Sequence, residues 1–178
     1  MQQGMFSFLS RILIVLAISS SVFAAQTVSE RKRAAGHPAT TVEQMQSLAQ
    51  DSEWVVRQYL GRNRRTPPEL LDKLAEDPHP QVRIAVATNL ATKEATFMKL
   101  ARDREVVVRS VVARFEYVPE KTLAFLADDS NAEIRLEVAK NLNTTSDTLK
   151  KLKSDPQPEV AMAAEVGLQR LAEESADQ

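Results

Sequence analysis

Apolar and polar positions repeat along most of this chain with a period of 26 residues. One column of the repeat holds leucine, and an aspartate follows it three residues later in every unit; the pairs are Leu48/Asp51, Leu74/Asp77, Leu100/Asp103, Leu126/Asp129 and Leu152/Asp155. An arginine preceded by a β-branched residue stands six residues after each of the first four aspartates. Five units without insertion or deletion indicate a repeat architecture, in which each unit is one supersecondary element.

Each unit predicts two short helices, and the unit 66–91 shows this most clearly. Thr66 is a natural N-cap, and Pro67 suits the first helical position, where its missing N–H costs nothing. Leu71 and Leu74 then share one helical face, and the Asp-Pro-His-Pro stretch 77–80 ends that helix. A second apolar stripe follows, made of Val82, Ala85 and Val86. Helices this short are marginal alone, so stacked neighbours must supply the core.

The strings TPPELLDKLAEDPHPQVRIAVATNLA (66–91) and DSNAEIRLEVAKNLNTTSDTLKKL (129–152) resemble the leucine-rich repeat variant (LRV) family, a relative in form of HEAT and armadillo repeats. The resemblance covers residues 40–172. It implies an all-α, right-handed α-solenoid of five 26-residue helix pairs, in which the first helix of each pair is α or 3₁₀. Some family members carry an iron–sulfur cluster on a cysteine-bearing segment, which a chain with 0 cysteines does not share. Such repeats mostly bind macromolecules, but a fold does not define a function.

The N-terminal 24 residues predict a secretory signal peptide. Arg11 precedes the apolar run 12–18, and the small residues around Ala24 suit a signal peptidase. The alternative is an uncleaved membrane anchor, although a bilayer span needs about 20 apolar residues. After cleavage we expect no membrane span and a periplasmic or secreted protein. The remaining boundaries are a flexible linker at 25–39, the solenoid at 40–172 and a disordered tail at 173–178.

The composition excludes several kinds of chemistry. With 0 cysteines, the chain has no disulfide, thiolate metal site or cysteine nucleophile. Its 4 glycines are too far apart for a phosphate-binding loop, and its formal net charge of −1 gives no support for nucleic-acid binding. We expect no cofactor and no metal. Neither His37 nor His79 has a spacing typical of a catalytic triad, so we predict no catalysis. The competing hypothesis is a HEAT-like enzyme with an acid/base site on the concave face.

The aspartate and arginine columns predict a structural ladder of ion pairs within and between repeats, in which the guanidinium groups also reach turn carbonyls. The alternative is an arginine stripe that binds phosphates or carboxylates. The fifth repeat has Ala161 in the arginine column, which suits a chain end where no further repeat docks. The ladder residues are Asp51, Arg57, Asp77, Arg83, Asp103, Arg109, Asp129 and Arg135.

The third repeat is the candidate partner-binding region. Phe115 stands where other repeats have asparagine, with Arg114 before it and Tyr117 after it, and Phe125 replaces a lysine or serine of the other repeats. Arginine and aromatic side chains dominate interface hot spots. The alternative is that these rings fill a packing gap between repeats. We therefore predict an exported scaffold that binds another protein of the cell envelope, of which an inhibitor or immunity protein for an exported toxin is a variant.

Overall fold

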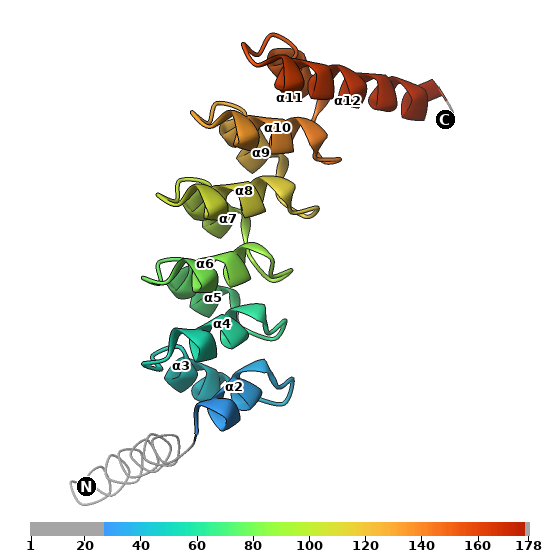
Figure 1. Cartoon of the computed structure of the whole chain (residues 1–178). Coiled ribbons are helices and arrows are strands. Elements are labelled where there is room, and N and C mark those ends of the chain that lie inside the picture. The colour runs from blue at the N-terminus through green and yellow to red at the C-terminus, as the bar shows by residue number, and fades with distance from the viewer. Residues whose placement is uncertain (1–26, 177–178) are drawn as a thin grey trace, which may run out of the picture.

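The computed structural model describes residues 27–176, and the predicted signal peptide lies outside them. Within this range all the regular secondary structure is helical, with no strand. The helix pairs stack one on another from α2 to α12 (Figure 1). The prediction of an all-α solenoid is confirmed, and the first helix of each repeat is α-helical. The helices are α2 (Val28–Gly36), α3 (Val42–Leu48), α4 (Trp54–Arg62), α5 (Pro68–Leu74), α6 (Pro80–Ala87), α7 (Glu94–Leu100), α8 (Val106–Arg114), α9 (Glu120–Leu126), α10 (Ala132–Lys140), α11 (Ser146–Leu152) and α12 (Pro158–Ala176).

The apolar columns form one continuous core that runs the length of the stack. The β-branched column is at most 1% exposed in every repeat; its members are Val56, Val82, Val108, Ile134 and Val160. The second helix of each repeat packs directly against the second helix of the next, whereas the seven-residue first helices stand further apart. Open grooves therefore separate the first helices, here called the short helices.

The aspartate column builds the turn between the two helices of each repeat. Asp51 Oδ1 accepts the backbone N–H of Glu53 at 2.9 Å, and Asp77 accepts that of His79 at 2.9 Å. The other three aspartates accept the N–H two residues later in the same way. Such Asx turns satisfy a backbone donor that the helix start would otherwise leave open.

A second ladder, of asparagine and threonine, fastens the opposite edge. Asn63 Nδ2 donates to the carbonyls of Ala35 and His37 at 2.8 and 3.1 Å, and Asn89 donates to those of Gly61 and Asn63 at 2.6 and 3.0 Å. The threonine three residues later donates a hydrogen bond from its hydroxyl to a carbonyl of the preceding helix, as Thr66 does to the Leu60 carbonyl at 2.7 Å. Where the asparagine and threonine are present, these bonds satisfy carbonyls that the helix ends would otherwise leave open.

The prediction of a flexible linker at 25–39 is wrong, because α2 occupies Val28–Gly36 and begins with a capping box at Thr27. This segment is the second half of a further repeat. Arg31, Ala35 and Thr40 stand 26 residues before Arg57, Gly61 and Thr66. Ala35 is fully buried, and Thr40 donates its hydroxyl to the Ala34 carbonyl. The solenoid therefore begins at residue 28 rather than 40.

The prediction of a disordered tail at 173–178 is wrong for residues 173–176, because α12 continues to Ala176. Gly167 and Arg170 stand where earlier repeats have the asparagine and threonine of the exit turn. Without those two side chains the last helix has no stop signal. Arg170 instead pairs with Glu174 one turn ahead at 3.0 Å and donates to the Leu142 carbonyl at 3.3 Å.

Candidate functional site: the grooves between the short helices

The Asp–Arg ladder runs beneath the short-helix grooves and connects each repeat to the next. Arg57 donates through Nε and Nη2 to both carboxylate oxygens of Asp77, at 2.6 and 3.0 Å. Its Nη1 donates to the Asp51 carbonyl at 2.5 Å, so the contact within the repeat is made to backbone and not to the carboxylate. The same arrangement recurs along the stack; the other pairs are Arg31–Asp51, Arg83–Asp103, Arg109–Asp129 and Arg135–Asp155.

The electrostatics of the ladder fit a structural role. No ladder side chain is more than 15% exposed. The hydrogen bond from Arg135 lowers the pKa of Asp155, while the hydrogen bond to Asp77 raises the pKa of Arg57. Burial opposes ionisation of Asp129, yet hydrogen bonds from Arg109 and the Asn131 N–H outweigh it, so its pKa is also lowered. Because both oxygens of each carboxylate meet one guanidinium, little of either charge is left for a ligand.

The four predicted partner-binding residues do not form one patch. Phe115 packs against the core and lies 5.9 Å from the Phe97 ring and 5.7 Å from the Tyr117 ring, measured between centroids. Tyr117 is 60% exposed, and Arg114 is exposed beside it. Phe125 lies near the other end of α8, where the Arg102 guanidinium sits 4.5 Å above its ring. Thus Phe115 fills a packing gap, whereas Tyr117 and Phe125 reach two different surfaces.

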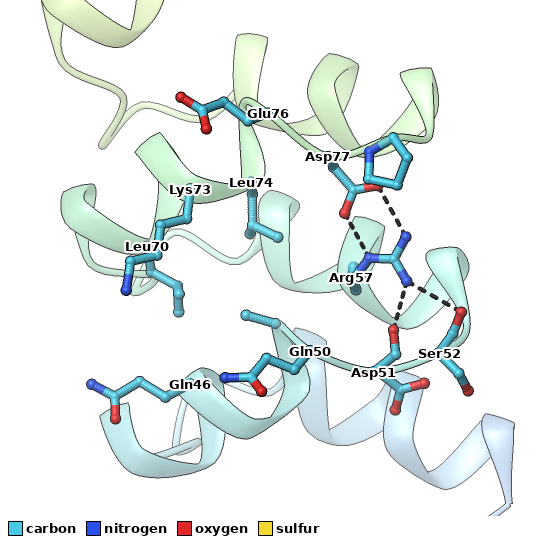
Figure 2. A pocket seen from close by; sticks show the side chains of 12 residues that line it. Gln46, Gln50, Asp51, Ser52, Arg57, Leu70, Lys73, Leu74, Glu76 and Asp77 are labelled. Carbon is cyan, nitrogen blue, oxygen red and sulfur yellow. Dashed lines mark hydrogen bonds and ion pairs between the residues drawn. The ribbon is translucent and has the colours of Figure 1, made fainter.

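A groove of about 820 Å³ lies between α3 and α5 (Figure 2). Its floor is apolar, formed by Ala49, Leu70 and Leu74. Its rim carries Lys73 on α5, which faces Gln46 on α3 and Gln50 in the turn that follows α3 (Figure 2). Two smaller hollows lie further along the stack, one of about 500 Å³ beside Arg102 and Phe125, and one of about 330 Å³ between the turns that follow α5 and α7.

The carboxylates that line this groove are already paired. Asp51 pairs with Arg31, and Asp77 pairs with Arg57. Glu76 forms an ion pair with Lys99 of the next repeat at 2.7 Å. Lys73 is the lining charge without an ion pair among residues 27–176. The side-chain amides of Gln46 and Gln50 make no hydrogen bond within residues 27–176. Within the described residues the groove therefore presents one lysine without an ion pair beside two amides without a hydrogen bond.

The equivalent grooves are bridged by the protein itself. In each of the next three repeats, the residue in the Lys73 column contacts the preceding short helix or the turn that follows it. Lys99 binds Asp72 and Glu76, at 3.0 and 2.7 Å. Phe125 lies under Arg102. Lys151 binds Asp128 at 2.5 Å. The sequence pattern did not predict the α3–α5 groove, because it shows Lys73 only as one of the lysines that share a column with Phe125.

The two histidines have structural roles in turns. His37 Nδ1 accepts the Ala39 N–H at 3.1 Å, and His79 Nδ1 accepts the Gln81 N–H at 3.3 Å. The His79 ring also stacks on Trp54, with centroids 3.9 Å apart and planes 3° from parallel. Residues 27–176 contain no group of three His, Asp or Glu side chains that could hold a metal ion. None of the helices in this range is long and apolar enough to span a membrane.

The stacked helix pairs and the two ladders define an α-solenoid, with a fold like that of a leucine-rich repeat variant. Among solved structures, the chain is similar to "a leucine-rich repeat variant with a novel repetitive protein structural motif", with 26% sequence identity and a TM-score of 0.66. The likeness covers 86% of this chain and 61% of that one, so this chain spans less than two thirds of the solved protein. No family model and no curated protein matches the chain.

Proposed function

We propose that this chain is an exported scaffold that binds another protein of the cell envelope and performs no catalysis. The observation that carries this proposal is the groove between α3 and α5, which is preformed, open to solvent and left unbridged although its counterparts are bridged. An α-solenoid offers an extended surface to a macromolecule, and the leucine-rich repeat variant fold fits this use. The predicted signal peptide supports a periplasmic or secreted location.

The scaffold is rigid by construction. A continuous apolar core, five Arg–Asp pairs and the asparagine clamps join neighbouring repeats within residues 27–176. A surface that is ordered before the partner arrives loses little conformational entropy on binding. The histidines, which a HEAT-like enzyme could use, are instead held as turn caps.

The test is crosslinking of the tagged full chain in intact cells of its host, followed by purification of the captured protein and calorimetric titration against the solenoid. We expect a saturable complex of defined stoichiometry. A Tyr117→Ser variant, which alters a 60% exposed ring, reports whether the exit-turn surface takes part. Absence of any saturable complex with the captured proteins would refute the scaffold function.

A further inference from the structure

We propose that the groove between α3 and α5 binds an acidic side chain of a protein partner. In this complex the Lys73 ammonium pairs with the partner's carboxylate, and the Gln46 and Gln50 amides donate hydrogen bonds to it. The proposal rests on the function proposed above and names the chemistry that the partner presents.

The repeat itself provides the internal comparison. Lys73, Gln46 and Gln50 stand 26 residues before Lys99, Asp72 and Glu76. In the later repeat the lysine ammonium lies 3.0 Å from one carboxylate and 2.7 Å from the other. In the earlier repeat both carboxylates are replaced by amides of similar shape and no charge. The position of the lysine is therefore kept while its intramolecular counter-ions are missing.

The lining charges favour a carboxylate as the missing group. The three lining carboxylates each have an ion-pair partner, in Arg31, Arg57 or Lys99, whereas Lys73 has none within residues 27–176. One ammonium with two amide donors matches one carboxylate, which carries a single charge and two acceptor oxygens. A phosphate group carries about −1.5 to −2 charges and is typically held by several cations. Among residues 27–176 the site offers one lysine without an ion pair, so an aspartate or glutamate side chain suits it better.

The shape of the groove favours a protein segment as the carrier of that carboxylate. The apolar floor of Ala49, Leu70 and Leu74 lies beside the charge, within a volume of about 820 Å³. A peptide segment can place an acidic side chain on Lys73 and an apolar neighbour over this floor. The lining side chains come from both sides of the groove, so a docked chain can contact both repeats (Figure 2).

The probe is a capped oligoglutamate peptide, titrated into the purified solenoid and followed by the backbone amide resonances of α3 and α5. We expect saturable shifts at residues 46–50 and 73–77 and no such shifts with an oligoglutamine peptide. Lys73→Gln should weaken binding about tenfold, the loss of one charge-assisted hydrogen bond. The matched variant Lys151→Gln, which removes the paired lysine of the same column in the fifth repeat, should leave peptide affinity unchanged.

A gain-of-charge variant separates the groove from general electrostatic attraction. The double substitution Gln46→Asp and Gln50→Glu reproduces the bridged groove of the next repeat, so it should abolish binding although Lys73 is retained. The matched change Ser47→Asp adds charge to α3 outside the groove lining and should weaken binding much less. The proposal is overturned if oligoglutamate binds the Lys73→Gln or bridged variants as tightly as wild type, or shifts only the arginine-rich turn 62–65.

The outcomes also distinguish this site from the scaffold function. A cellular partner that binds wild type and the bridged variant equally leaves the scaffold function standing and overturns the groove assignment. Failure to find any saturable partner refutes the scaffold function, whereas the oligoglutamate titration still reports on the groove itself.

Discussion

At the scale of single residues, the columns explain both the well-packed positions and one defect. Thr122 is fully buried, and its hydroxyl has no hydrogen-bond partner in the described part of the chain. In the preceding repeat, Thr96 donates its hydroxyl to Asp72 at 2.9 Å. Met98 stands where Thr122 would need the corresponding aspartate. The unsatisfied hydroxyl therefore arises because the aspartate column holds methionine at residue 98, while the threonine column is kept at residue 122.

Replacing Thr122 with valine should stabilise the protein. The change removes an unsatisfied buried hydroxyl at nearly constant shape, and we expect the free energy of unfolding to rise by about 1 kcal/mol. Chemical denaturation measures it. Thr96→Val is the control, because it breaks a real hydrogen bond and should lower the free energy of unfolding. Equal losses in both variants would contradict this assignment of Thr122.

Leu100 tests the register of the core. It is fully buried at the middle of the leucine column. Leu100→Ala should lower the free energy of unfolding by about 2–5 kcal/mol, because truncation leaves a cavity that the stacked helices cannot close. Denaturant unfolding monitored by circular dichroism gives the value. A neutral substitution at this site is incompatible with the core described above.

At the scale of helices, the two ladders fasten opposite edges of the stack, and two junctions lack the asparagine clamp, α6–α8 and α10–α12, where Phe115 and Gly167 stand in its column. Asparagine joins α2 to α4, α4 to α6, and α8 to α10. Between α6 and α8 the asparagine and threonine are replaced by Phe115 and Val118. These two helices also pack less extensively than α4 with α6 or α8 with α10. Contact of Phe115 with Phe97 is the local substitute for the missing hydrogen bonds.

The clamp predicts a strong effect at Asn141. Its amide donates to the carbonyls of Ala113 and Phe115 at 2.7 and 3.0 Å, and the residue is only 7% exposed. Asn141→Ala should cost about 1–3 kcal/mol of unfolding free energy, because both acceptors stay near the core without that donor. Asn143→Ala, at an exposed position two residues on, should cost less. Thermal melts of the two variants compare them, and equal melting temperatures would rule out the clamp.

The Asp–Arg ladder predicts a loss of stability in acid. The pKa values of Asp129 and Asp155 are lowered in the folded state. Their contribution is therefore fully present above the unfolded pKa of about 3.9, and it is lost as pH falls through the folded values. Asp155→Asn should flatten the fall in unfolding free energy between neutral pH and pH ~3 relative to wild type. Denaturation across this pH range measures the difference, and parallel curves would contradict the ladder's role.

At the scale of the whole molecule, periodicity predicted the solenoid, its helix pairs and its core columns. The half repeat at α2 was missed because the leucine and aspartate columns begin at Leu48 and Asp51, and only Arg31 and Thr40 continue the pattern backward. The candidate site was missed for a different reason. Among the described residues Lys73 has no ion pair, unlike Lys99 in the same column. This difference is visible only once the structure shows that Lys99 contacts Asp72 and Glu76 across the repeat boundary. Local propensity carries no information on such cross-repeat pairs.

Site-specific photocrosslinking in intact cells tests the central claim, that the solenoid surface holds a protein partner, most directly. A photoreactive residue is placed at Gln50 and, as a matched control, at Ser154, which occupies the same column of the last repeat. We predict one discrete protein adduct from position 50 and little from position 154. No discrete adduct from either position, with the variants folded and present at wild-type levels, would contradict the claim.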